Sequence, residues 1–508
     1  MSNNVNSLLK VSNLAVSFDT VEGSINAVQG IDFELNKGQT LAIIGESGSG
    51  KSVTASVIMG ILTCPPGRIK SGEIFLNKQD ILKLSETDRR ELMGNKIAII
   101  FQDTLSHLNP VFTVGAQIAE CFEVHKNYTK KESWDKAVKL LDRVKIPNPH
   151  KRAKDYPHQF SGGQRQRVMI AMALALEPDI IIADEPTTAL DVTIQAKILE
   201  LLAELRDERN MGLILITHDL GIAAEVADKV IVLKNGKIVE KGTLKDVFIK
   251  PKHKYTKELM NSIPGKFNQK YKRNDNIDTN PILEVKNISK SYDTLACDNV
   301  NFNLFRDEII GIVGESGSGK TTISNLILRL IEPSSGSILY HGSNIFDFDK
   351  KELFNFRRKV QIVFQDPYAS LNPTMNVFDI ISEPWIIHPD FLDKNLHQAR
   401  MSELLTSVGL QPSDSKKYPH EFSGGQRQRI AIARALALNP EIIICDEAVS
   451  ALDVSIQAQI IKLLKDLRNK FSLSYIFIAH DLPVVRDLAD RVIVMKSGEI
   501  LELSLIHI

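Results

Sequence analysis

Short apolar runs alternate along the chain with longer stretches in which apolar residues recur every three or four positions. The strand-sized runs lie at residues 41–44, 97–101, 180–183 and 213–217. One of the helix-like stretches carries apolar side chains on a single helical face, at Ile194, Ile198, Leu201 and Leu205. Strands that are apolar on both faces and alternate with amphipathic helices are typical of a parallel sheet covered by helices on both sides. The pattern therefore predicts an α/β fold.

The two halves of the chain repeat the same short motifs in the same order. The repeated pairs are GESGSGK(S/T) at 45–52 and 314–321, FSGGQRQR at 160–167 and 422–429, and DE at 184–185 and 446–447. The copies lie 262 to 269 residues apart, which is too long for a solenoid repeat. We interpret the chain as one domain duplicated in tandem.

We expect the first domain to cover residues 8–264 and the second to cover residues 281–508, with a linker at 265–280. The linker is rich in Asn, Lys and Asp, so it cannot bury enough apolar surface to order itself. Residues 503–508 (LSLIHI) depart abruptly from the course of the first half and match a peptide encoded by the transposon end of sequencing adaptors. We expect these six residues to be non-native and the second domain to be truncated.

The repeated glycine-rich motif matches the GxxxxGK[ST] pattern of a phosphate-binding loop, and it follows an apolar run and precedes a helical one, as that pattern requires. Glycines let backbone N–H groups turn inward around phosphate oxygens, and the helix adds the positive end of its dipole. We expect Lys51 to reach the β- and γ-phosphates and Ser52 to bind Mg²⁺. A glycine turn without a ligand is the alternative, and two near-identical copies argue against it. The predicted loops comprise Gly45, Glu46, Ser47, Gly48, Ser49, Gly50, Lys51 and Ser52, and Gly314, Glu315, Ser316, Gly317, Ser318, Gly319, Lys320 and Thr321.

An acidic pair ends an apolar run in each half, where the side chains of a parallel sheet emerge beside such a loop. Asp184 can hold Mg²⁺ through water, and Glu185 can polarise the water that attacks a phosphate. An acidic pair after a strand is often only a turn, but the two phosphate loops favour the catalytic interpretation. Asp446 and Glu447 have the same roles in the second half.

A serine and two glycines precede a helical run in each half. Paired glycines permit close approach of the backbone and leave amides free, which makes a second anion site. In isolation this motif could equally be an ordinary loop. The two copies consist of Ser161, Gly162, Gly163 and Gln164, and of Ser423, Gly424, Gly425 and Gln426.

Both halves, over essentially the whole chain, carry a phosphate loop, a glutamine after an apolar run, SGGQ, DE and a histidine. This ordered set resembles an ATP-binding-cassette ATPase. The resemblance implies two RecA-like P-loop NTPase cores, each with an inserted helical subdomain that lies roughly between residues 102 and 161 in the first half. It also implies ATP and Mg²⁺ as cofactors, and two cassettes paired head to tail so that the SGGQ of one faces the γ-phosphate held by the other.

The same resemblance gives roles to residues outside these motifs. Gln102 and Gln365 would sense Mg²⁺ and water, and the two switch histidines, His218 and His480, would hold the γ-phosphate. Phe18 and Tyr292 match the aromatic residue that stacks on adenine, although an aromatic there could equally be a strand residue. The implied Mg²⁺ ligands are Ser52, Gln102, Asp184, Thr321, Gln365 and Asp446.

Composition and charge narrow the possible partners. The 62 basic residues balance 62 acidic ones, which argues against a mainly electrostatic nucleic-acid binder. Four widely spaced cysteines indicate neither a disulfide framework nor a zinc site. Because no apolar run reaches membrane-spanning length and the N-terminus lacks the layout of a signal peptide, we expect the chain to stay in the cytoplasm and to reach a membrane only through a partner. For an ATPase that works with membrane permeases, the resemblance implies a peripheral position on the cytoplasmic face of the bacterial inner membrane.

Two classes of tandem cassette remain, the motor of a membrane transporter and a soluble factor that acts on ribosomes. Ribosomal factors usually carry a long, charged helical linker and a differently worded loop after the catalytic glutamate. Here the linker is short, and residues 185–191 read EPTTALD. FQDP at 364–367, SLNP at 370–373 and KHKYT at 252–256 resemble the oligopeptide/dipeptide importer subfamily.

This second resemblance implies the ATP-hydrolysing motor of an importer for peptides or peptide-like solutes, with both composite ATP sites in one chain. The implied partners are two membrane permease subunits and a solute-binding protein, and dipeptides, oligopeptides, microcin C, glutathione and nickel chelates all fit as cargo. Thr104 and Ala448 replace expected prolines without removing a phosphate-contacting group. We expect the permeases to dock on the helical insertions, at Val114 and Val377.

Overall fold

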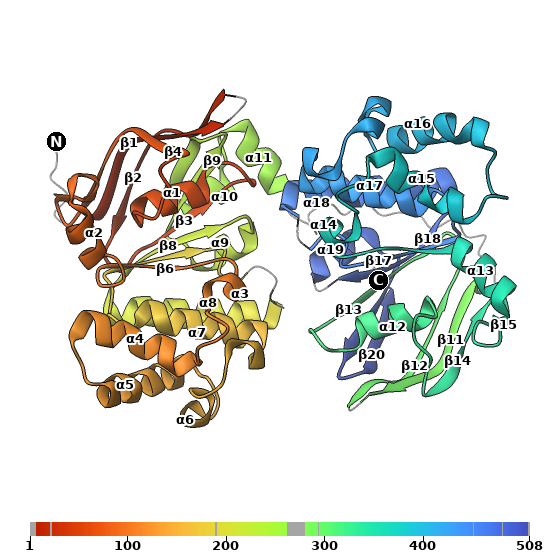
Figure 1. Ribbon diagram of the computed structural model, residues 1–508, viewed down its shortest axis with the longest axis horizontal. Helices are drawn as coiled ribbons and strands as arrows, with labels where there is room; N and C mark the ends of the chain where they lie inside the picture. Colours follow the sequence, from red (N-terminus) through yellow and green to blue (C-terminus); the bar gives the residue numbers. More distant parts are fainter. Residues whose placement is uncertain are drawn as a thin grey trace. The chain divides into compact units, whose positions relative to one another are not determined.

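The computed structural model describes residues 7–20, 23–187, 190, 192–261, 280–292, 294–450, 452–479 and 481–505. The chain divides into two compact units, Met1–Ser262 and Ile263–Ile508 (Figure 1). The predicted linker lies outside the described residues except for Asn280, and the exact domain limits remain predictions.

The first unit contains two sheets. The antiparallel sheet has the order β2-β1-β4-β5, with β1 (Ser7–Thr20), β2 (Gly23–Asn36), β4 (Gly67–Leu76) and β5 (Gln79–Asp80). The larger sheet has the order β10-β9-β3-β8-β7-β6, with β3 (Thr40–Ile44), β6 (Ile97–Ile100), β7 (Ile180–Asp184), β8 (Gly212–Thr217), β9 (Lys229–Lys234) and β10 (Lys237–Thr243). Strands β3 and β6 to β9 run parallel, and β10 pairs antiparallel with β9. The predicted α/β class is therefore confirmed.

The helices of the first unit cover both faces of the larger sheet. They are α1 (Lys51–Ile58), α2 (Glu86–Leu92), α3 (Thr104–His107), α4 (Val114–Lys126), α5 (Lys130–Arg143), α6 (Pro149–Arg152), α7 (Gly162–Leu174), α8 (Val192–Arg209), α9 (Leu220–Val226), α10 (Leu244–Ile249) and α11 (Lys254–Asn261). Figure 1 shows α4, α5 and α6 grouped at one side of the sheet, opposite β1, β2 and β4. The predicted insertion after Gln102 thus contains α3 to α6.

Alternation along one buried strand explains why the sheet needs a cover on each side. Ile180 and Ile182 pack in one cluster with residues of β1, β2 and α1, whereas Ile181 and Ala183 pack in another with residues of α4, α5, α7 and α8. All four side chains are fully buried. The double-sided apolar run recognised in the sequence is therefore the interior strand β7, between β8 and β6, and it delivers Asp184 to the end of the sheet.

The second unit repeats this architecture. Its antiparallel sheet has the order β12-β11-β14-β15, with β11 (Leu283–Ser291), β12 (Leu295–Leu304), β14 (Ser335–Tyr340) and β15 (Ser343–Asn344). Its larger sheet has the order β16-β17-β18-β13-β19-β20, with β13 (Ile309–Gly314), β16 (Val360–Val363), β17 (Ile442–Asp446), β18 (Ser474–Ala479), β19 (Arg491–Lys496) and β20 (Glu499–Leu505). Its helices are α12 (Lys320–Ile327), α13 (Lys350–Lys359), α14 (Pro367–Ser370), α15 (Val377–Ile387), α16 (His397–Ser407), α17 (Gly424–Leu436), α18 (Val454–Phe471) and α19 (Leu482–Leu488).

The C-terminal residues that the sequence singles out extend the last hairpin. Leu503 pairs with Ile493 and Leu505 with Arg491, as β20 runs antiparallel to β19. Residues 506–508 lie outside the described part of the chain. Among the described residues of both units, no helix has the length and apolar character needed to cross a bilayer.

Candidate active site

Each glycine-rich loop connects a central strand to a helix, with glycines where no side chain fits. Gly50 directly precedes α1 with φ at 101°, and no side chain caps that helix. A Cβ on Gly50 would lie 2.5 Å from the carbonyl oxygen of Ala27, and one on Gly45 would lie 2.4 Å from that of Leu233. Because no side chain caps α1, the N–H groups of its first turn remain available as donors. These donors and the positive end of the helix dipole face the loop.

The lysine of each loop is buried and folds back over its own backbone. Lys51 Nζ donates to the carbonyl oxygens of Gly45 at 2.7 Å and Glu46 at 2.9 Å. Lys320 makes the same two bonds, to Gly314 at 2.8 Å and Glu315 at 2.9 Å. A positive charge is therefore held by backbone carbonyl oxygens at the start of each loop, directly before the helix whose first-turn N–H groups can bind a polyphosphate.

A hydroxyl and a carboxylate lie together at the end of the sheet in the first unit. Ser52 Oγ donates to Asp184 Oδ1 at 3.1 Å. Burial raises the pKa of Asp184, the bond from Ser52 lowers it, Glu185 raises it and Lys51 lowers it, and the net pKa is above its usual range. Asp184 is thus a buried carboxylate whose negative charge its neighbours stabilise only in part. Together with the hydroxyl oxygen of Ser52, it provides the hard oxygen ligands that Mg²⁺ prefers.

The second unit repeats this pairing, and there a second hydroxyl, that of Ser324, also contacts the aspartate. The pKa of Asp446 is raised by burial and by Glu447, against the lowering effects of Lys320, Thr321 and Ser324. The structure thus brings each loop hydroxyl to the carboxylate that the sequence pairs with it.

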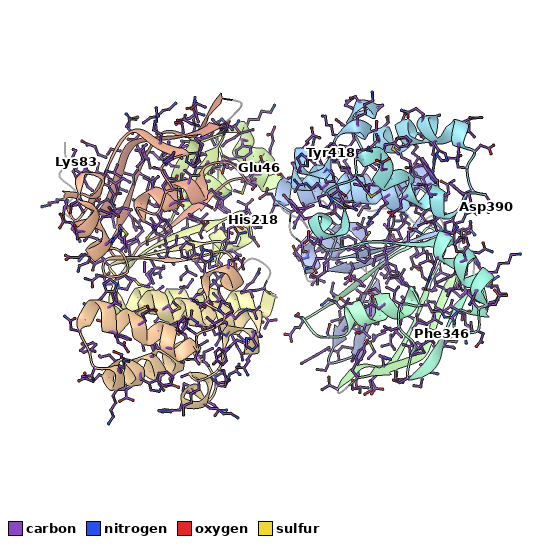
Figure 2. All side chains as sticks on the ribbon, viewed as in Figure 1. Glu46, Lys83, His218, Phe346, Asp390 and Tyr418 are labelled. Carbon is purple, nitrogen blue, oxygen red and sulfur yellow. The ribbon has the colours of Figure 1, made fainter. Side chains whose placement is uncertain are left out.

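The glutamate after each of these aspartates is held by a glutamine from the neighbouring strand end. Gln102 Nε2 donates to Glu185 Oε2 at 2.8 Å, and His218 Nδ1 lies 3.1 Å from Glu185 Oε1. Gln365 Nε2 donates to Glu447 Oε2, also at 2.8 Å. His218 is labelled in Figure 2, and its predicted counterpart His480 lies outside the described residues.

Both glutamates adopt a backbone conformation that non-glycine residues rarely use. The φ angle is 48° at Glu185 and 48° at Glu447. Backbone N–H groups of the two residues donate to Ile216 and Ile478 of the adjacent strand at 2.9 Å. Such left-handed residues cost energy and cluster at functional sites, where the surrounding structure holds them in place. Nothing in the residue spacing indicated this feature.

The SGGQ motifs form the first turns of α7 and α17. Ser161 caps α7 by accepting from the N–H of Gln164, whose side chain accepts in return from the N–H of Ser161. A Cβ on Gly163 would lie 2.5 Å from Ile194 of α8, and one on Gly425 would lie 2.5 Å from Ile456 of α18. The second glycine of each motif is therefore required for close helix packing, and the close approach that the paired glycines permit is made to a neighbouring helix.

The two aromatic residues proposed to stack on adenine have different surroundings. Phe18 lies in β1, partly buried against the apolar cluster that includes Val28 and Ile31. Tyr292 is 57% exposed, with Lys290 Nζ 5.2 Å from its ring centroid. Phe18 thus has the packing of a strand residue, and Tyr292 presents an open face; their contact with adenine stays a prediction.

The choice of Val114 and Val377 as docking positions is wrong. Both side chains are fully buried at the starts of α4 and α15, where they pack into the cores of the helical subdomains. The exposed apolar residues of that region are Val111 and Phe112, which precede α4 and are 72% and 55% exposed. The family resemblance indicated where the insertion lies, but it could not say which of these neighbouring side chains faces outward.

Comparison with known proteins gives a consistent match. The profile of the ABC transporter family matches residues 28–188 and 297–450. The glutathione import ATP-binding protein GsiA of Escherichia coli (strain K12) is 44% identical over 98% of this chain and 86% of its own length, and that of Shigella dysenteriae serotype 1 shows the same identity and coverage.

Solved structures with similar folds match roughly half of the chain. The ATP-binding cassette MJ0796, in a post-hydrolysis dimer bound to ADP and Pi, aligns with 46% of this chain and 98% of its own, at 28% identity and a TM-score of 0.43. The protein cbiO1 of Clostridium perfringens, part of the ABC transporter complex cbiONQ, aligns with 44% of this chain and 89% of its own, at 30% identity and a TM-score of 0.42.

Proposed function

Because the chain belongs to the ABC transporter family, whose members hydrolyse ATP, we propose that it is the motor subunit of an importer for peptides or peptide-like solutes. The proposal rests above all on the repeated geometry of the two units. In each, a buried lysine lies within a phosphate loop, and a glutamine holds the carboxylate of the glutamate that follows the aspartate at the strand end. The importer relatives favour transport over a ribosomal role.

The residues of each unit have separate roles in this reaction. Lys51 and the first turn of α1 bind the phosphates of ATP, and Lys320 and α12 do the same in the second unit. Mg²⁺, when bound, withdraws charge from the phosphate oxygens. Ser52, Asp184 and Gln102 would hold it in the first unit, and Thr321, Asp446 and Gln365 in the second.

The glutamates orient the water. Glu185 and Glu447 accept a hydrogen bond from the attacking water, so that its oxygen faces the γ-phosphorus as the bond to ADP breaks. His218, which lies beside Glu185, and His480 would contact the γ-phosphate. Each of these histidines would stabilise the negative charge that develops on the phosphate oxygens during the reaction, without forming a covalent bond.

We propose that the two cassettes complete each other. Site one combines residues 45–52, Asp184 and Glu185 with Ser423–Gln426, and site two combines residues 314–321, Asp446 and Glu447 with Ser161–Gln164. The chain would lie on the cytoplasmic face of a bacterial membrane, bound to two membrane permease subunits that carry the motion, with a solute-binding protein that selects the cargo. The glutathione importer relatives support a small peptide-like solute.

Replacing both glutamates tests the catalytic assignment. Glu185→Gln with Glu447→Gln preserves side-chain shape but removes the charge that orients water. We expect ATP hydrolysis to fall by about 10²-fold or more, while ATP binding is retained. Phosphate release and equilibrium binding of radiolabelled ATP measure the two properties separately. Hydrolysis at the parental rate would contradict the assignment.

A further inference from the structure

A tyrosine from the segment after β10 contacts the phosphate loop of the first unit. Tyr255, the second residue of α11, accepts a hydrogen bond through its hydroxyl from the backbone N–H of Glu46 at 3.3 Å. The two residues are 209 positions apart in the chain. Glu46 is labelled in Figure 2 close to the place where Figure 1 labels α11.

The tyrosine is held firmly by its surroundings. Its side chain is only 4% exposed, and Lys234 Nζ, at the end of β9, lies 4.2 Å from the ring centroid. The turn before α11 is fixed to β10, because the backbone N–H groups of Lys252 and His253 donate to the two carboxylate oxygens of Glu240 at 2.8 and 3.1 Å. The hydroxyl position is therefore set by β9 and β10, two strands of the larger sheet.

The same short piece of loop is held from other directions as well. Gly45 abuts the carbonyl oxygen of Leu233, which precedes Lys234 on β9. The carbonyl oxygens of Gly45 and Glu46 accept from Lys51. When Lys51 turns to bind phosphate, these two bonds are lost, whereas the bond from the Glu46 N–H to Tyr255 does not involve the lysine and can persist.

We propose that Tyr255 is a positioning residue for nucleotide binding in the first cassette, which fixes the start of the phosphate loop in its binding conformation. The inference rests on the proposed function, since it requires that residues 45–52 bind ATP. A loop already ordered before binding loses less conformational freedom when the ligand arrives, so the hydroxyl contact increases affinity without touching ATP. Tyr255 would thereby couple the α11 segment to occupancy of site one.

Single-site backgrounds of the full chain isolate this effect. Lys320→Ala leaves only the first loop intact, and Lys51→Ala leaves only the second. We expect Tyr255→Phe to weaken binding of a fluorescent ATP analogue by about 2- to 10-fold in the Lys320→Ala background, the size of one neutral hydrogen bond, and to leave binding unchanged in the Lys51→Ala background. Tyr255→Phe should shift the midpoint of thermal unfolding only slightly, and by the same amount in both backgrounds.

Tyr128→Phe is the matched control. Tyr128 lies between α4 and α5 of the same unit and also has a lysine, Lys136, over its ring at 4.7 Å. We expect this change to alter affinity in neither background. Unchanged or tighter binding by Tyr255→Phe in the Lys320→Ala background, or equal weakening in both backgrounds, would overturn the inference. Failure of the proposed function looks different: the Lys320→Ala chain with Tyr255 intact would then not bind the analogue at all.

Discussion

The side-chain amide of Gln102 donates to Glu185 at 2.8 Å, and Gln365 makes the same bond to Glu447 at the same distance. Each glutamine stands where a strand of the larger sheet leads into the helical subdomain, after β6 and β16 respectively. The orientation of the Glu185 and Glu447 carboxylates therefore depends in part on the segment that connects the sheet to the subdomain. A movement of that subdomain would reach the glutamate through one hydrogen bond.

Removing these amides should slow the chemical step. With Gln102→Ala and Gln365→Ala together, we expect kcat for ATP to fall by about 10-fold or more, because each glutamate loses a hydrogen bond to its charged form. KM should rise less than kcat falls, since one proposed Mg²⁺ ligand is lost at each site but the loop lysines, hydroxyls and aspartates are untouched. Steady-state phosphate release measures both constants. A parental kcat would show that the contact plays no part in turnover.

The two kinds of loop glycine should respond differently to alanine. Gly50 has φ at 101° and its Cβ would clash with a backbone carbonyl, whereas Gly48 has φ at 74° and nothing within 4 Å of the Cβ position. We expect Gly50→Ala to lower the thermal stability of the first unit and to abolish ATP binding there. Gly48→Ala should cost only about 1 kcal/mol of backbone strain, because nothing surrounds the Cβ position. We expect it to weaken ATP binding all the same, because the added methyl group takes up part of the open space beside the loop. Differential scanning calorimetry with ATP titration separates the two outcomes.

Local motifs explain why so much of the site could be predicted from sequence. The turn that precedes α1 and the end of β7 are specified by neighbouring residues, so Lys51, Ser52 and Asp184 fall where the spacing places them. The antiparallel sheet formed by β1, β2 and β4 was not foreseen, since β4 joins the β1–β2 hairpin from about 50 residues further along the chain. The Tyr255 contact escaped notice for the same reason.

Exposed and buried residues at the start of α4 should respond differently to substitution by aspartate. Val111→Asp with Phe112→Asp changes two exposed side chains, so we expect basal ATPase and thermal stability to change little. Transport by the complex with its permeases should be lost if this surface is the docking site. Val114→Asp buries a charge and should destabilise the unit by about 4 kcal/mol or more. Full transport by the double variant would place the docking surface elsewhere.

A partly exposed network of hydrogen bonds and ion pairs in the second unit should make its stability depend on acid pH. Glu441 lies 2.8 Å from His341 Nε2, 3.1 Å from Lys359 Nζ and 3.0 Å from the Tyr340 hydroxyl. Burial alone would raise the pKa of Glu441, but hydrogen bonds from His341, Lys359 and Tyr340 outweigh it and lower the pKa from 4.5 to about 2. The stabilisation is thus complete above pH 4.5 and is lost as pH falls toward 2.

Glu441→Gln should therefore destabilise the second unit by about 1–2 kcal/mol at neutral pH, and the difference from the parent should shrink below pH 4.5. The chain has two tryptophans, so a Trp134→Phe background leaves Trp385 of α15 as the reporter of this unit. Asp390→Asn is the control, since Asp390, labelled in Figure 2, has a 72% exposed side chain that pairs with Arg358 at 3.4 Å. A pH-independent difference would refute the account.

The pairing of loops and SGGQ motifs between cassettes can be decided with two matched double variants. Both are made in the Glu185→Gln, Glu447→Gln chain, where bound ATP is not hydrolysed. Lys51→Ala with Ser423→Arg places both changes in site one, so we expect one ATP retained per chain. Lys51→Ala with Ser161→Arg damages one component of each site, so we expect none.

The two serines cap α7 and α17 through the same capping box, so each variant loses an equivalent helix cap, worth about 1 kcal/mol. Retained nucleotide is counted after rapid gel filtration. If each cassette instead bound ATP with its own SGGQ, the two results would be exchanged.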